Sequence, residues 1–213
     1  LEADSLNCAI LAPEIDDDAA TWAAFVNNLV TDMTQKTGQK CTAVRRILVP
    51  RERVDAVVEN LVDRLGRIAI GDPADEATKM GPLASGAQFE DVSAGMQALL
   101  AVARAACGGP TKLSGRGYFL APTLLVANDP EAEVLHSLEV FGPCATVIPY
   151  DGSAAEATRL ANRGGGGLVA SVYANDKRWT EDLVLGIAPW HGRLWVCSDK
   201  VADQAYAPGM VLP

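Results

Sequence analysis

Short apolar runs alternate with longer amphipathic patterns along most of this 213-residue chain, and this alternation limits the folds open to it. The apolar runs predict strands at 6–11, 44–49, 145–150, 168–173 and 193–197. Apolar residues at three- and four-residue spacing predict helices at 18–36, 54–65, 85–106, 154–162 and 176–185. Because strands that alternate with helices are typical of α/β domains, we expect one such domain over residues 1–213. Its sheet should be open, largely parallel and flanked by helices.

Turn-forming residues indicate where some of these elements begin and end. The acidic run 16–18 is suited to cap the first helix, and Gly38 is suited to end it. The stretch 115–126 has the composition of an extended segment, but Pro122 interrupts it. Because proline cannot donate a hydrogen bond within a sheet, we expect an edge strand or a bent strand there.

The overall charge of the chain is acidic. Lysine and arginine total 18 against 27 aspartate and glutamate residues, which gives a formal net charge of −9 and a pI near 4.7. The two basic pairs Arg45-Arg46 and Lys177-Arg178 are expected to be solvated or ion-paired rather than part of a binding stripe. No apolar run reaches the roughly 18 to 20 residues of a membrane span. We therefore expect neither nucleic acid nor a membrane as a partner.

Cysteine usage indicates the redox setting. The chain has five cysteines, none of them in a C-x-x-C pair: Cys8, Cys41, Cys107, Cys144 and Cys197. An odd number of isolated cysteines argues against a disulfide framework or a zinc site and favours a reducing, cytoplasmic setting. His136 and His191 have no second ligand at metal spacing, so no metal site is expected.

Cys41 lies at a junction, after a helical pattern and a glycine turn and directly before the run 44–49. A thiol at such a junction can be presented at the end of a rigid element, as nucleophilic cysteines are, although most cysteines are small buried hydrophobes. Glu2 and Glu139 each precede a predicted strand, so carboxylates could converge with the thiol at the strand ends, where open α/β sheets bind ligands. A carboxylate there could activate the thiol or a water molecule. The other four cysteines are interpreted as structural.

Two motifs occur around these residues in the order of a known family. Gly38-Gln39-Lys40-Cys41 resembles the cysteine motif of the aldehyde dehydrogenase family, and Glu139-Val140-Phe141-Gly142-Pro143 resembles its E-x-F-G-P motif. Residues 1–7, Leu-Glu-Ala-Asp-Ser-Leu-Asn, stand where the family has E-L-G-G-K. This departure resembles the subgroup that acts on coenzyme A linked semialdehydes in phenylacetate degradation. Further matching stretches, at 70–73, 79–82, 119–124 and 191–193, extend the likeness over nearly the whole chain.

The resemblance implies a reaction and the residues that carry it. Cys41 would attack an aldehyde carbonyl to give a thiohemiacetal, and its backbone amide would form part of the oxyanion hole. Glu2 would activate the water that hydrolyses the resulting thioester to the acid. Glu139 would hold the hydroxyls of the nicotinamide ribose, and Phe141 would pack near the ring. The implied cofactor is NADP or NAD, with NADP favoured.

The family's dinucleotide-binding domain precedes its glutamate motif, so the chain is expected to be a catalytic domain that lacks it. Because removing that domain would expose an apolar face, we expect a homo-oligomer. Two alternatives remain open. The chain could be a folded remnant or assembly module without redox activity, or a cofactor-free thiol esterase that uses Cys41 and a carboxylate.

Overall fold

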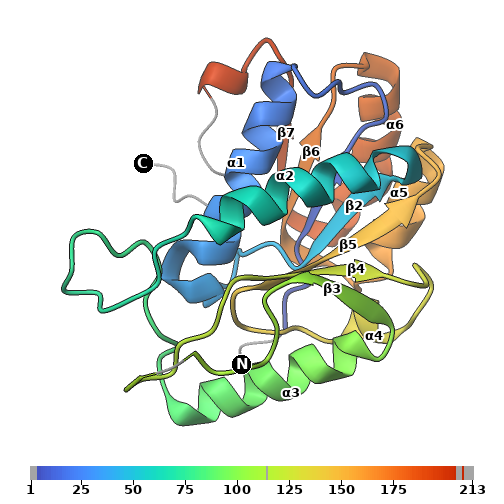
Figure 1. Ribbon diagram of the computed structural model, residues 1–213. Coiled ribbons are helices and arrows are strands. Elements are labelled where there is room, and N and C mark those ends of the chain that lie inside the picture. The colour runs from blue at the N-terminus through green and yellow to red at the C-terminus, as the bar shows by residue number, and fades with distance from the viewer. Residues whose placement is uncertain (1–3, 114, 205–207, 209–213) are drawn as a thin grey trace.

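A seven-stranded sheet forms the centre of the computed structural model, which describes residues 4–113, 115–204 and 208 (Figure 1). The strands are β1 (Cys8–Leu11), β2 (Arg46–Pro50), β3 (Ala103–Cys107), β4 (Thr123–Ala127), β5 (Cys144–Tyr150), β6 (Gly167–Tyr173) and β7 (His191–Cys197). Their order across the sheet is β3-β4-β5-β2-β1-β6-β7, and every neighbouring pair is parallel except β3 with β4. The expected open, largely parallel α/β sheet is confirmed.

Helices cover both faces of this sheet. They are α1 (Ala20–Thr34), α2 (Val54–Gly66), α3 (Gly86–Leu100), α4 (Val134–Ser137), α5 (Ala154–Asn162) and α6 (Lys177–Ile187). Helices α1 and α2 pack side by side on one face, and α5 and α6 pack side by side on the other (Figure 1). All residues of β1 and β2 are therefore buried, as is typical of central parallel strands. No helix within the described ranges is long and apolar enough to cross a membrane.

Side-chain caps begin three of the helices. Ser85, Ser153 and Asp176 each accept a hydrogen bond from a backbone amide in the first turn of α3, α5 and α6. The expectation for the first helix was wrong at both ends. The acidic run 16–18 does not cap α1, which begins at Ala20 after an uncapped Ala19. The helix ends at Thr34, because the next residues leave helical geometry.

Two further expectations need correction. The helix expected at 85–106 ends at Leu100, and β3 follows it. The alanine-rich sequence of β3 has little β propensity, so antiparallel pairing with β4 decides the conformation of this segment. The expected edge or bent strand near Pro122 is instead the interior strand β4, which begins directly after the proline and pairs on both sides. The short helix α4 was not predicted.

Candidate functional site

Three segments of the chain meet at the amino edge of the sheet. Cys8 of β1 is in register with Arg46 of β2, which is in register with Thr146 of β5. Because these strands are adjacent and parallel, the segments that precede them leave the sheet side by side. Those segments carry Ser5, Cys41 and Glu139 respectively. The expected convergence of a thiol and a carboxylate is observed, but at the edge opposite to the carboxyl edge where such sheets usually bind ligands.

A pocket of about 520 Å³ is lined by residues of all three segments. Its lining residues are Asp4, Ser5, Gln39, Cys41, Ala84, Gln88, Glu139 and Phe141. Cys41 is exposed to it from the turn before β2. Glu2, the expected base, lies outside the described residues, so its role stays a prediction. The roles of Cys41, Glu139 and Phe141 are likewise predictions that this arrangement supports.

The turn that carries Cys41 has an unusual backbone. The 3₁₀ segment η1 (Gln35–Gly38) follows α1, and Lys36 and Thr37 within it have φ angles of 54° and 58°. Gly38 continues the left-handed run with φ of 67°. Residues other than glycine rarely adopt this conformation, and it is found where the surrounding structure requires it. Here the Thr37 hydroxyl donates to the carbonyl oxygen of Gly81 at 3.0 Å, which helps to hold the turn.

Lys40, directly before Cys41, forms a largely buried ion pair. Its Nζ lies 2.6 Å from Oδ1 of Asp32 on α1, with side chains 12% and 7% exposed. Burial raises the pKa of Asp32, and the nearby ammonium opposes that rise. The positive charge of Lys40 is therefore paired with Asp32 of α1, and this ion pair links the turn to the helix that precedes it.

Glu139 is held from two directions. Its Oε1 accepts from Nε of Arg45 at 3.1 Å, and its Oε2 accepts from the backbone amide of Ser5 at 2.9 Å. Each carboxylate oxygen can accept more than one hydrogen bond, so Glu139 keeps capacity for a donor in the pocket. The Arg45 guanidinium also lies 5.4 Å from the centroid of the Phe141 ring. Sequence reasoning missed Arg45 as a part of the site.

Two glutamines add a polar wall that was also missed. Nε2 of Gln39 donates to Oε1 of Gln88 at 3.0 Å, and Oε1 of Gln39 accepts from the backbone amide of Ala84 at 2.9 Å. Gln39 lies within the cysteine motif, so its position gave a signal. Gln88 lies on α3, far along the chain, and no feature of its sequence surroundings indicates the site.

The other cysteines differ from Cys41 in burial. Cys8, Cys144 and Cys197 are buried and Cys107 is partly buried. Burial raises the pKa of each of these thiols, to about 12 for Cys144 and to about 11 for Cys197. They are kept as neutral thiols, which agrees with the structural role expected for them. Cys41 is the exposed thiol of the five.

The two histidines are engaged by other groups. The ring of His136 is buried, with Nδ1 3.2 Å from Nη1 of Arg46 and Nε2 2.8 Å from the carbonyl oxygen of Pro130. Nδ1 of His191 lies 3.0 Å from the carbonyl oxygen of Ile187. Among the residues with a described position, no group of three His, Cys, Asp or Glu side chains could hold a metal ion.

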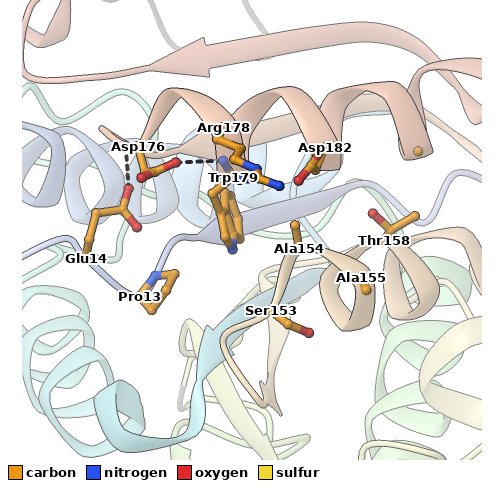
Figure 2. Close-up of a pocket in the computed structure, with 11 residues that line it drawn as sticks. Pro13, Glu14, Ser153, Ala154, Ala155, Thr158, Asp176, Arg178, Trp179 and Asp182 are labelled. Carbon is orange, nitrogen blue, oxygen red and sulfur yellow. Dashed lines mark hydrogen bonds between the residues drawn. The ribbon is translucent and has the colours of Figure 1, made fainter.

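A larger hollow, of about 930 Å³, lies at the carboxyl edge of the sheet between α5 and α6 (Figure 2). Its polar groups mostly stabilise the loops around it. Glu14 accepts from the backbone amides of Asn175 and Asp176, each at 2.8 Å, and Asp176 caps α6. The indole of Trp179 donates to the carbonyl oxygen of Gly152 at 2.9 Å. The hollow shares no lining residue with the Cys41 pocket, which contains the exposed thiol.

Comparisons with known proteins agree with the sequence motifs. Residues 1–204 match the aldehyde dehydrogenase family. A 3,4-dehydroadipyl-CoA semialdehyde dehydrogenase from Aromatoleum evansii is 37% identical over 220 residues, covering 100% of this chain and 42% of that relative. A succinate-semialdehyde dehydrogenase (NADP+) from Mycolicibacterium paratuberculosis is 33% identical, over 83% of this chain and 37% of that relative.

Solved structures give the same result for the fold. Betaine aldehyde dehydrogenase from Staphylococcus aureus in complex with NAD+ has a TM-score of 0.79 at 27% identity, over 92% of this chain and 38% of that one. An aldehyde dehydrogenase C variant from Pseudomonas syringae was solved with NAD+ and octanal. It has a TM-score of 0.80 at 31% identity, over 91% of this chain and 39% of that one. The chain thus spans less than half the length of these similar proteins.

Proposed function

This chain belongs to the aldehyde dehydrogenase family, and from that premise we propose that it forms the catalytic part of an NAD(P)-dependent enzyme that oxidises an aldehyde to an acid. One observation carries the proposal. Cys41, the exposed cysteine, opens into the same pocket as Glu139 and Phe141. An exposed thiol therefore lies beside a carboxylate and an aromatic ring, which supports roles for them toward the ribose and the nicotinamide ring of the cofactor. A dinucleotide-binding region outside these residues would complete the enzyme.

In this proposal Cys41 Sγ forms a bond to the aldehyde carbon, and the carbonyl oxygen becomes the hydroxyl of a thiohemiacetal. A nicotinamide cofactor, when bound, would supply the acceptor for the hydride of that carbon. The hydroxyl then loses its proton to water, and the carbon becomes the carbonyl of a thioester to Cys41. Water, deprotonated by Glu2, then hydrolyses the thioester, which releases the acid and restores the Cys41 thiol. The Cys41 backbone amide is the proposed oxyanion donor, a contribution typically worth about 2.7 to 4 kcal/mol.

The residues present fit a nicotinamide cofactor. Glu139 lines the pocket with both oxygens anchored by protein donors, so the carboxylate is oriented before a ligand arrives. Its remaining lone pairs can accept from ribose hydroxyls. Phe141 offers an apolar surface beside it. We favour NADP over NAD, as for the succinate-semialdehyde relative whose name includes NADP+.

For the substrate we propose a coenzyme A linked semialdehyde. The support is the 37% identity, over the whole chain, to a dehydrogenase named for 3,4-dehydroadipyl-CoA semialdehyde. We further propose that the protein is a homo-oligomer and works in the reducing cytoplasm, where its isolated cysteines would stay as thiols.

The assignment is tested by substituting Cys41 in the complete protein that carries this chain. We expect Cys41→Ala to lower aldehyde-dependent NAD(P)H formation by about 10⁴-fold or more, because the nucleophile is lost. The matched control is Cys107→Ala, which removes another partly accessible thiol and should leave the rate unchanged. Retained activity in Cys41→Ala would refute the proposal.

Two assays on the 213-residue chain separate the alternatives. A burst of p-nitrophenol from p-nitrophenyl acetate, lost in Cys41→Ala, would show an acylated thiol without cofactor, as a thiol esterase requires. Calorimetric titration with NADP(H) tests whether the chain alone binds the cofactor. A chain with neither property would favour the folded remnant or assembly module.

A further inference from the structure

The side chain of Arg45 joins two of the segments that line the Cys41 pocket, the turn before β2 and the loop 138–143 before β5. The guanidinium is buried, with 4% of the side chain exposed. Nη2 donates to the carbonyl oxygens of Gly38 at 3.0 Å and Lys40 at 3.4 Å, both in the turn that carries Cys41. Nη1 donates to the carbonyl oxygen of Gly142 at 3.0 Å, and Nε donates to Glu139. The planar guanidinium therefore binds the turn that carries Cys41 on one side and the loop that carries Glu139 on the other.

The backbones of these loops also touch directly. A Cβ atom added at Gly38 would lie 2.2 Å from the carbonyl oxygen of Gly142 and 2.8 Å from Cα of Pro143. No side chain fits between the loops at this point. Their separation is thus set by backbone contact on one side and by the Arg45 bridge on the other.

We infer that Arg45 is a positioning residue, which fixes the distance between the Cys41 turn and the Glu139 carboxylate so that both serve one substrate-cofactor complex. This inference rests on the proposed function. Arg45 acts through Glu139 and through backbone carbonyls, and it does not touch the reacting atoms. Its positive charge pairs with the negative Glu139 carboxylate, whose other oxygen accepts a hydrogen bond from the backbone amide of Ser5.

The geometry requires arginine rather than a generic cation. A guanidinium presents five N–H donors in a rigid plane, whereas an ammonium presents three donors at a single point. Lysine at position 45 could keep the ion pair with Glu139 but could not also reach Gly38 and Gly142 on opposite loops. The two roles of Arg45, charge pairing and spanning, can therefore be separated by substitution.

The test compares Arg45→Lys and Arg45→Met with wild type in the complete protein, using aldehyde oxidation rates per site titrated by the p-nitrophenol burst. We expect Arg45→Met to lower kcat about tenfold or more and to raise the KM for NAD(P) about fivefold or more. Arg45→Lys should restore the KM to within about threefold of wild type while kcat stays low, because only the charge returns. The control is Arg67→Met, an exposed arginine paired with Asp63, which should change neither constant.

The outcomes separate this inference from the proposed function. A wild-type protein without aldehyde-dependent NAD(P)H formation would overturn both. An active wild type whose folded Arg45→Met variant keeps kcat per titrated site and KM within about twofold of wild type would overturn the inference alone. If Arg45→Met does not fold, Arg45→Lys decides: low kcat with near-normal KM supports the inference, and an unchanged kcat overturns it.

Discussion

The side-chain amide of Asn7 donates to the carbonyl oxygen of Cys41 at 2.8 Å, which ties the backbone of the candidate nucleophile to the start of β1. The same nitrogen donates to the carbonyl oxygen of Ala43 at 2.9 Å. Oδ1 of Asn7 accepts from the backbone amide of Val169 at 2.9 Å and from the hydroxyl of Ser5 at 2.8 Å. One buried amide thus connects the segments before β1 and β2 with the start of β6.

We expect Asn7→Ala to lower the free energy of unfolding by about 3 kcal/mol, because it leaves the buried groups of Ala43 and Val169 without this partner. Urea unfolding followed by tryptophan fluorescence measures the change. The matched control is Asn27→Ala, an exposed asparagine on α1, which should stay within about 0.5 kcal/mol of wild type. A loss below about 1 kcal/mol in Asn7→Ala would contradict the connecting role.

Most of the sheet could be predicted from the sequence, because buried parallel strands such as β1 and β2 are continuous apolar runs. Strand β3 could not, since its alanine-rich sequence suits a helix and only its pairing with β4 makes it a strand. The cysteine and E-x-F-G-P motifs predicted the residues that meet in the pocket, but not the edge of the sheet at which they meet.

The basic pair Arg45-Arg46 shows what the sequence left undecided. The pair was expected to be solvated or ion-paired. Arg45 is ion-paired with Glu139, and its side chain is also buried. Arg46 is 1% exposed and its hydrogen bonds go to backbone carbonyls and His136 rather than to a carboxylate. The only available signal was the position of the pair in the apolar run 44–49, because β2 begins at Arg46 and the side chains on both faces of this central strand are buried. Some of their acceptors, such as Glu139 and Leu160, lie more than 90 residues away along the chain.

Gly38 offers a test of the contact between the two pocket loops. Gly38→Ala should lower the free energy of unfolding by about 3 kcal/mol or more, because a left-handed alanine is strained and its Cβ would overlap the Gly142 backbone. Gly165→Ala is the matched control, with φ of 69° but no atom within 4 Å, and should cost only about 1 kcal/mol. Thermal and urea unfolding measure both. Equal losses in the two variants would mean that the loops can separate freely.

Arg46 offers a second packing test, at the end of α5. Its guanidinium donates to the carbonyl oxygens of Leu160 and Ala161 at 2.9 Å each and also to that of Leu6. A Cβ at Gly164 would lie 2.2 Å from Nη2 of Arg46. The end of an arginine side chain usually moves easily, but here movement breaks buried hydrogen bonds.

Gly164→Ala should therefore lower the free energy of unfolding by about 2 kcal/mol. The control is Gly66→Ala at the end of α2, where no atom lies within 4 Å of the added Cβ, and where alanine should be neutral or stabilise by up to about 1 kcal/mol. Denaturant midpoints at constant m-value measure both changes. A neutral Gly164→Ala would show that the Arg46 contacts contribute little.

His136 should make stability depend on pH through its contact with Arg46. Burial lowers the pKa of His136, the hydrogen bond to Pro130 opposes this, and the Arg46 charge lowers it further. With its hydrogen on Nε2, the neutral ring donates to Pro130 and accepts from Arg46. Protonation of Nδ1 would replace this acceptor with a donor facing the guanidinium.

The unfolded chain binds a proton at this histidine near pH 6.5, and the folded chain does so only at lower pH. The stability contribution of the neutral ring is therefore fully present above about pH 7 and is lost as the pH falls through 6.5 toward the folded pKa. Burial also lowers the pKa of His191, which acts in the same direction. We expect His136→Gln to flatten the dependence of the unfolding free energy on pH between about 7.5 and 5.5, and His191→Gln to remove a separate part of it. Urea titrations across this range, with the His136 ring titrated by NMR, measure the effect; an NMR midpoint at or above 6.5 in the folded protein would contradict it.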